Sequence, residues 1–392
     1  MSRNAREQPI RLRVLLACDS LSIGGAERHV IGLASALKRH GHEVTIACST
    51  GGPLVPHAAA AGVSLRPLSD RLVKRRVSVS YAGRLARLVG SGRFDLVHAH
   101  MHASSAAAAI ACAYSEVPLV ITEHSEASWR DERARRTSRS VFRRAAHVIA
   151  VSRGIGRRLT DEDGVPVDQV SVIRNALPPD VDGDRRPNLR RLMPGAPLIG
   201  AVARLVPEKG VALFLRAAAT VLRELPSARF VVIGDGPLRE ELVASSQKLG
   251  IAPHVRFLGA RLDGPRLIAE LDVLAVPSFN EGTPLVTLEA LSSGVAVVAS
   301  AVGGIPEQVE GFPRVALVPP GDPGALARAL VEMARTAGRR PSSSRRSGDI
   351  ILLPGHEAMV RRTEAVYASV CEQARRGAAE EIGPLRERWL AR

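Results

Sequence analysis

Two glutamates stand eight residues apart in the segment FNEGTPLVTLE, residues 279–289. Thr283 and Pro284 favour a helix start, because Thr caps helices and Pro suits the first helical position. Glu281 is then expected in the loop before the helix, and Glu289 about 9 Å along its axis. The spacing leaves three interpretations open: a hydrolytic acid pair, two ordinary solvated charges, or two contacts to one elongated ligand.

A helix N-terminus between two carboxylates adds a site for an anion, since free amides and the positive end of the dipole meet there. A nucleoside diphosphate sugar fits that order, with ribose hydroxyls at one carboxylate and sugar hydroxyls at the other. A glycosidase pair lies roughly 5–10 Å apart but needs no helix end between its carboxylates. On spacing alone, a loop acid and a helix-surface acid explain the pair equally well.

Cations and glycines stand at two other strand-to-helix turns. Arg204 and Lys209 in ARLVPEKG (203–210) would neutralise a diphosphate, although surface charge at such a turn is common. Gly24 and Gly25 in SLSIGGAE would let backbone amides approach a phosphate or sugar. The glycine pair also fits any tight turn, and it lacks the full G-x-G-x-x-G dinucleotide pattern.

Short apolar runs that alternate with helical patterns must position these groups. One series runs from 13–19 to 170–175 and a second from 197–203 to 314–320, which predicts an α/β fold with two parallel sheets. A Pro-rich stretch, 177–195, has the composition of a linker. We therefore predict domains over 1–185 and 186–350 and a C-terminal segment, 351–392, with a helix over 357–373. We also predict a disordered stretch at 336–349 and a ligand cleft between the sheets.

Composition limits the partners. The 392 residues carry a net charge of +15 and only 3% aromatic side chains, which argues against nucleic-acid binding by base stacking. The first 190 residues hold 29 Lys and Arg against 18 Asp and Glu, which suggests an anionic partner or a chain generally rich in arginine. Four cysteines without a C-x-x-C spacing suggest a reducing compartment. No apolar run is long enough to span a bilayer.

Several of these segments together resemble one family. EGTPLVTLEAL and the residues that follow it to 307, RLVPEKG (204–210), VVIGDGP (231–237) and GGAE (24–27) are similar to glycosyltransferase family four. The similarity covers roughly residues 11–335. It implies a GT-B fold, in which two Rossmann-like domains face each other across a cleft and a final helix packs back on the first domain. It also implies a retaining transfer from a nucleotide sugar.

The resemblance also implies residue roles. Catalytic roles would fall to Glu281, His124, Arg204 and Lys209, with the two cations at the donor diphosphate. Acceptor-side roles would fall to His100, His124 and Ser152. Glu289 would hold the ribose of the donor. The expected donor-binding set is Gly24, Gly25, Arg204, Lys209, Gly234, Asn280, Glu281, Gly282, Thr283, Pro284, Leu285 and Glu289.

We expect neither cofactor nor metal, because no Asp-x-Asp stands among the candidate phosphate ligands. The acceptor is expected to be a glycan or a lipid-linked glycan of cell-surface polysaccharide or glycolipid synthesis. Residues 71–90 are basic and partly amphipathic, so they would contact an anionic membrane from the cytoplasmic side or form a solvated helix surface. The alternative activity is a nucleotide-sugar epimerase or hydrolase on the same fold.

Overall fold

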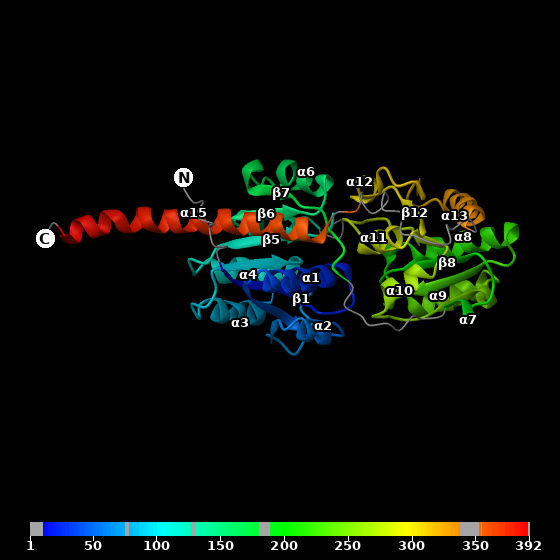
Figure 1. Cartoon of the computed structure of the whole chain (residues 1–392), viewed down its shortest axis with the longest axis horizontal. Coiled ribbons are helices and arrows are strands. Elements are labelled where there is room, and N and C mark those ends of the chain that lie inside the picture. Colours follow the sequence, from blue (N-terminus) through cyan, green and yellow to red (C-terminus); the bar gives the residue numbers. More distant parts are fainter. Residues whose placement is uncertain are drawn as a thin grey trace, which may run out of the picture.

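Two parallel sheets with flanking helices lie side by side along the longest axis of the computed structural model (Figure 1). The structure describes residues 11–74, 78–126, 131–179, 189–337, 353 and 355–390. The first half contains seven strands and the second six. This arrangement confirms the predicted α/β fold with two Rossmann-like halves.

The first sheet has the strand order β3-β2-β1-β4-β5-β6-β7, and all of its pairings are parallel. Its strands are β1 (Arg13–Ser20), β2 (Glu43–Thr50), β3 (Ser64–Pro67), β4 (Leu96–His100), β5 (Leu119–Glu123), β6 (His147–Ala150) and β7 (Val170–Val172). Its helices are α1 (Gly25–Arg39), α2 (Val55–Ala60), α3 (Val79–Val89), α4 (His102–Cys112), α5 (Glu132–Phe142) and α6 (Arg153–Asp161), and a 3₁₀ turn spans Val167–Gln169. Seven of the eight residues of β1 are buried, as expected for a strand covered on both faces.

The second sheet has the order β10-β9-β8-β11-β12-β13, again parallel throughout. Its strands are β8 (Leu198–Val202), β9 (Arg229–Ile233), β10 (Val255–Phe257), β11 (Val273–Val276), β12 (Ala296–Ser300) and β13 (Val315–Val318). Its helices are α7 (Leu189–Leu192), α8 (Val211–Glu224), α9 (Arg239–Lys248), α10 (Gly264–Ala269), α11 (Leu285–Ser292), α12 (Ile305–Val309) and α13 (Pro323–Ala337), with 3₁₀ turns at Pro207–Lys209 and Ala252–His254. In both sheets the order reverses near the centre, and ligands bind beyond the carboxyl ends of the strands at such a point.

The last helix, α15 (His356–Leu390), returns to the first half, and its far end extends beyond the body of the protein (Figure 1). Met359, Val360 and Tyr367 belong to the same buried cluster as Leu33 and Leu37 of α1. The hydroxyl of Tyr367 also lies 2.6 Å from Nδ1 of His98 on β4. The C-terminal segment therefore completes the core of the first half.

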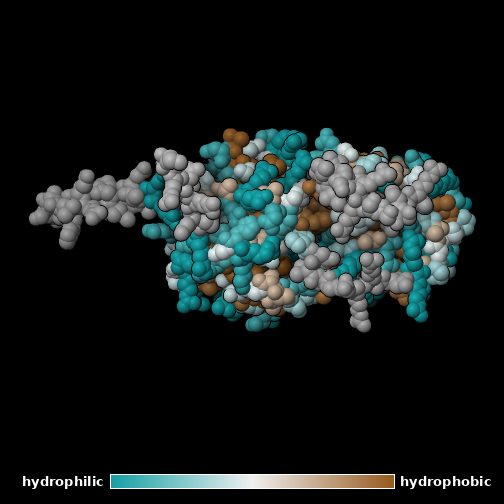
Figure 2. Space-filling model, viewed as in Figure 1, coloured by the Kyte–Doolittle hydropathy of each residue, from teal (hydrophilic) through white to brown (hydrophobic). Residues whose placement is uncertain are grey.

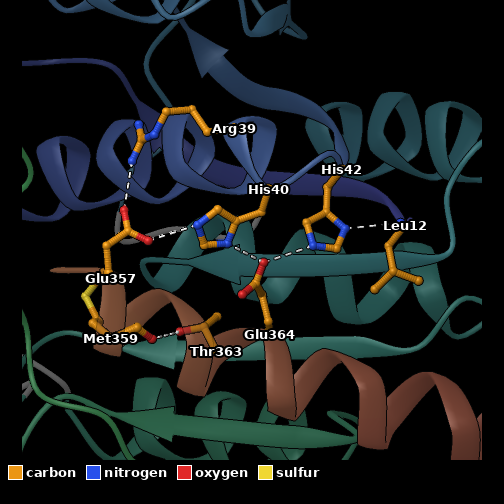
Figure 3. A network of polar contacts seen from close by, with 8 residues as sticks. All are labelled: Leu12, Arg39, His40, His42, Glu357, Met359, Thr363 and Glu364. Atoms are coloured by element: carbon orange, nitrogen blue, oxygen red, sulfur yellow. Dashed lines mark hydrogen bonds and ion pairs between the residues drawn. The ribbon is translucent and has the colours of Figure 1, made fainter. Parts of the chain in front are cut away.

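A polar network ties the same helix to the end of α1 (Figure 3). Glu364 Oε1 lies 2.8 Å from Nδ1 of His40 and 3.0 Å from Nε2 of His42. Glu357 contacts Nε2 of His40 at 2.9 Å and accepts a hydrogen bond from Arg39 at 3.1 Å. The hydrogen bond to Glu364 is the main cause that raises the pKa of His40 above its usual value. These contacts secure α15 at the rim of the apolar core.

Three elements differ from the sequence-based expectations. Strand β3 was missed because it is short and mostly exposed, so it carries no apolar run. The segment expected to be a linker contains α7, since Leu189 and Met193 are buried there against the second half. The helix expected over 357–373 is longer at both ends. Most of the predicted disordered stretch, from residue 338 onward, lies outside the described residues.

On the face seen in Figure 2, hydrophobic residues form small patches among hydrophilic ones. Among the described residues, no helix is both long enough and apolar enough to span a membrane. In α3 the apolar side chains Tyr81, Ala82 and Leu85 pack into the core, while Arg84 and Arg87 are exposed. The part of the expected membrane-contact region that is helical thus uses its apolar face for packing.

Candidate active site

A cavity of about 770 Å³ separates the two halves at the carboxyl ends of their strands. This volume is typical of a site for a small organic ligand. All residues of the predicted donor-binding set line the cavity, and so does His124. His100 and Ser152 are absent from its lining. The two halves thus bring together segments that are more than 250 residues apart in the sequence.

Helix α11 points its N-terminus at this cavity. Pro284, in an extended conformation, is the N-cap, and no side chain caps the helix. The expected cap by Thr283 is wrong, because the helix begins one residue later than predicted. Thr283 instead accepts hydrogen bonds from Nδ2 of Asn175, at 2.9 Å to Oγ1 and 3.1 Å to the carbonyl oxygen. Within the described structure, the amides of Leu285 and Val286 at the start of α11 therefore remain available to an anion, whereas the Thr287 amide donates to the carbonyl oxygen of Pro284.

Glu281 lies just before α11 and is buried. Nζ of Lys209 donates a hydrogen bond to its Oε1 at 2.7 Å, and Oγ of Ser278 donates to the same oxygen at 2.8 Å. Lys209 comes from the 3₁₀ turn after β8, so the two predicted catalytic residues meet across different βα units. Their contact fixes a charge pair next to the N-terminus of α11.

Glu289 is 4% exposed on α11 and pairs with Arg28 on α1, in the other half of the molecule. Burial raises the pKa of the Glu289 carboxyl above its usual value, and the Arg28 guanidinium opposes that rise. Sequence analysis missed Arg28. A possible signal was its position directly after GGAE, in the first turn of a helix that opens at the cleft.

Arg204 is exposed and lines the cavity after β8. It makes no ion pair with any residue that the structure describes. Its guanidinium nevertheless acts on the pKa of Glu27, where it opposes the rise caused by burial. Arg204 is therefore a cation that can approach a phosphate without first breaking a salt bridge.

Two glycines permit close backbone contacts around the cavity. A Cβ on Gly282 would lie 2.1 Å from the carbonyl oxygen of His124, which belongs to the other half. Gly234 has φ +137°, and a Cβ there would lie 1.8 Å from the carbonyl oxygen of Ala203. Larger residues would push the halves or the turns apart, so these positions require glycine.

Histidines line the first half beneath the cavity. Nε2 of His124 lies 3.1 Å from Nδ1 of His100, and the rings of His29 and His124 pack edge to face with centroids 5.0 Å apart. Burial lowers the pKa of both His98 and His124 to about 3, so these rings are neutral. Ring nitrogens of His29, His100 and His124 lie within 4.8 Å of one another, so this set could hold a transition metal ion.

Ser152 is the N-cap of α6, where its hydroxyl accepts a hydrogen bond from the Ile155 amide at 3.1 Å. The next residue, Arg153, donates its amide to Glu307 of the second half at 3.0 Å. In the described structure, then, Ser152 shapes a contact between the halves and does not face the cavity.

Two buried acids of the cavity escaped sequence analysis. Asp19 is the second-last residue of β1 and accepts hydrogen bonds from the amide and the hydroxyl of Ser104, each at 2.9 Å. Burial raises the pKa of Asp19 to about 6. Glu27 is buried in the first turn of α1, and burial raises its pKa as well. An acid at a strand end and another in a first turn look like ordinary solvated charges in a sequence.

Two family models match the chain: Glycosyltransferase Family 4 over residues 23–181 and Glycosyl transferases group 1 over residues 196–336. The D-inositol 3-phosphate glycosyltransferase of Actinosynnema mirum is 31% identical over 326 residues, which cover 73% of this chain and 78% of that protein. An uncharacterized glycosyltransferase of Methanocaldococcus jannaschii is 28% identical, with 78% of this chain and 84% of that protein covered. Among solved structures, Anabaena HepE in complex with UDP and glucose has a TM-score of 0.72 and 21% identity, over 95% of this chain and 100% of that one.

Proposed function

The chain belongs to glycosyltransferase family 4, and from that premise we propose that it transfers a sugar, with retention at the anomeric carbon, from a nucleoside diphosphate sugar to a glycan or lipid-linked acceptor. One observation carries the proposal. The N-terminus of α11, which no side chain caps, opens into the cavity between two buried carboxylates, with Lys209 and Arg204 beside it. Arg204 has no ion-pair partner within the part of the chain that the structure describes. These groups are complementary to a diphosphate with a hydroxyl-rich group at each end: the cations and amides suit the phosphates, and the carboxylates suit the hydroxyls.

The donor in this proposal lies along α11. Glu289 accepts hydrogen bonds from ribose hydroxyls, and Glu281 lies beside the hydroxyls of the transferred sugar. Arg204, Lys209 and the first amides of α11 bind the diphosphate. Gly24 and Gly25 allow the α1 turn to approach the donor phosphate and sugar. The relative HepE, whose structure contains UDP and glucose, supports this class of donor.

Charge development explains why these groups accelerate transfer. As the bond between the anomeric carbon and the phosphate oxygen breaks, negative charge builds on the diphosphate. The two cations and the helix amides are already oriented toward that charge, so they stabilise the transition state more than the ground state. The acceptor hydroxyl attacks from the face that the diphosphate leaves, and a phosphate oxygen takes its proton. No protein nucleophile, cofactor or metal is assigned a step.

The acceptor is proposed to bind against the first half, near His124. The relative from Actinosynnema mirum, named for D-inositol 3-phosphate, supports a polyol-containing acceptor. Cell-surface polysaccharide or glycolipid synthesis is the proposed pathway class. Any contact with a membrane at 71–90 would be made by exposed charges such as Arg84 and Arg87 together with the exposed apolar side chains of Leu72 and Val79, because the rest of the apolar face of α3 is packed. Nothing in the cavity favours the epimerase or hydrolase alternative.

A thermal-shift panel tests the donor site. The wild type would be mixed with UDP, GDP, ADP and dTDP and with their glucose and mannose derivatives, next to Glu289→Ala and Arg204→Ala. One nucleoside diphosphate series is expected to raise the wild-type melting temperature, and both variants should lose that response while they remain folded. If no nucleotide shifts the wild type, the proposed donor site is wrong.

A further inference from the structure

The ion pair between Arg28 and Glu289 joins the two halves inside the cavity. Nη1 of Arg28, on α1, contacts Oε1 of Glu289, on α11. Arg28 remains 28% exposed, whereas Glu289 is almost fully buried. Within the described part of the chain, Oε2 of Glu289 has no hydrogen-bond partner. One oxygen of this carboxylate is thus held by a cation while the other is available to a hydroxyl donor.

The surroundings of Glu289 offer little other charge. β11 and β12, which pack against α11, contain no ionisable residue. Before α10, Arg261 and Asp263 form an ion pair with each other, and the ion pair of Glu289 is made with Arg28 and not with Arg266 of α10. Lys209 donates its hydrogen bond to Glu281, just before the start of α11. Among described residues, Arg28 is therefore the only direct counter-charge of Glu289.

We propose that Arg28 is a positioning residue for the donor: from the first half, it keeps the Glu289 carboxylate charged and oriented for the ribose hydroxyls, so that donor affinity depends on contact between the halves. The inference rests on the donor site proposed above. Residue types support it, because an ionised carboxylate accepts strong hydrogen bonds from hydroxyls, whereas a protonated one loses part of its acceptor capacity.

Burial supplies the physical reason. A buried carboxylate without a partner takes up a proton, and burial already raises the pKa of Glu289 even with Arg28 present. Removal of the guanidinium removes both influences that oppose this rise, its charge and its hydrogen bond. Separation of the halves would break the same ion pair and release the Glu289 carboxylate from its orientation, since Arg28 and Glu289 lie on different halves. Opening of the cleft would then lower the affinity for the nucleotide and favour its release.

The test measures affinity against pH by isothermal titration calorimetry. The full-length wild type, Arg28→Met and Arg28→Lys would be titrated with the nucleoside diphosphate found in the panel, at pH 6.5, 7.5 and 8.5. The ratio of variant to wild-type Kd cancels the titration of the nucleotide itself. For Arg28→Met the ratio should be about tenfold at pH 6.5 and should fall toward 1 as pH rises. Arg28→Lys should keep a ratio near 1 throughout.

Two further variants separate this role from a structural one. In a protein that carries Glu289→Gln, the further change Arg28→Met should leave the nucleotide Kd almost unchanged, because a neutral amide needs no counter-charge. Arg39→Met on the same helix is the matched control, since Arg39 pairs with Glu357 far along α1, and it should leave Kd unchanged. If Arg28→Met fails to fold, Arg28→Gln replaces it.

Three results overturn the inference. The first is a Kd ratio of Arg28→Met that does not depend on pH. The second is a double variant whose loss of nucleotide affinity equals the sum of the losses of Arg28→Met and Glu289→Gln. The third is tighter nucleotide binding by Arg28→Met, which would mean that Arg28 competes with the donor. Failure of the proposed function looks different, because the wild type itself would then bind no nucleotide.

Discussion

The two walls of the cavity hold their polar groups in opposite ways. The second half presents charges, with Arg204 exposed and Lys209 hydrogen-bonded to Glu281. In the first half, the region around His124 (the neutral wall) presents neutral imidazoles: the pKa of His124 is lowered to about 3, and its ring packs edge to face with that of His29. Arg28 on α1 brings charge to another part of the same half. The charged wall suits a diphosphate, whereas the neutral wall suits hydroxyls that need both donors and acceptors. The comparison teaches that one fold, used twice, gives different chemistry according to whether its buried polar residues are paired charges or neutral rings.

Loss of a cation from the charged wall should have the largest effect. Lys209→Met removes a positive charge from the proposed leaving-group site and leaves Glu281 with Ser278 but without its cationic partner. The rate of nucleoside diphosphate release from the donor should fall by about 10²–10³, typical for removal of a group that stabilises developing charge. A coupled assay for the released diphosphate measures it. Lys248→Met, at the exposed end of α9, is the control. Full activity of Lys209→Met would remove the distinction between the walls.

Asp19 is a buried acid of the first half, and it offers the next largest effect. Its pKa is raised from 3.8 to about 6, so the folded state prefers the protonated form. The associated stability is present below pH 3.8 and is lost as pH rises through about 6. At pH 8 the ionised group costs on the order of 3 kcal/mol, from 1.36 kcal/mol per pH unit.

Asp19→Asn should therefore raise the melting temperature at pH 8, and the gain should shrink toward pH 4. Asn retains an oxygen that can accept the two hydrogen bonds from Ser104. Asp95→Asn is the opposite control, because the hydrogen bond from Arg13 lowers the pKa of Asp95. That variant should lose stability at pH 8. A gain for Asp19→Asn that is equal at both pH values would mean that its charge is not the cause.

Tyr367→Phe, a change behind the neutral wall, should lower the free energy of unfolding moderately. The change removes the hydroxyl beside Nδ1 of His98 and leaves a buried ring nitrogen without a partner. The loss should be about 1–2 kcal/mol of unfolding free energy, measured by urea denaturation. Donor affinity should not change, since Tyr367 lies behind the histidines. A weaker nucleotide Kd would show that the two walls are coupled.

The smallest expected effect concerns His98 and His124, whose side chains should not titrate near neutral pH. Because burial lowers the pKa of His98 and His124 to about 3, their rings should stay neutral between pH 5.5 and 8.5. Histidine NMR signals, assigned with His98→Gln and His124→Gln, should not move over that range. His40, whose pKa is raised, should titrate in the same spectra and serves as an internal control. A mid-range titration of His124 would place charge on both walls.

The residues of the charged wall stand in short stretches of sequence, whereas the resemblance named only His100 and His124 of the histidine cluster and gave no sign of His29 or His98. Glu281, Thr283 and Glu289 lie within one loop and helix, so their order along the chain already sets their order in space. The histidine cluster depends on α1, β4 and β5, which meet only through the sheet order β1-β4-β5. The role of Arg28 could not be predicted for the same reason, because its partner Glu289 is 261 residues away in the sequence. Both parallel sheets followed from apolar runs, whereas β3 lacks such a run.

The return of α15 also has a consequence for the order of synthesis. Met359, Val360, Tyr367, Val370 and Cys371 belong to the core of the first half, yet they leave the ribosome after the whole second half. Domains generally fold as units during translation, and the first one made usually folds first. Here the second half can finish its sheet while the first still has an open apolar face. A nascent chain halted before residue 356 would expose that face, and chaperone binding would be expected there.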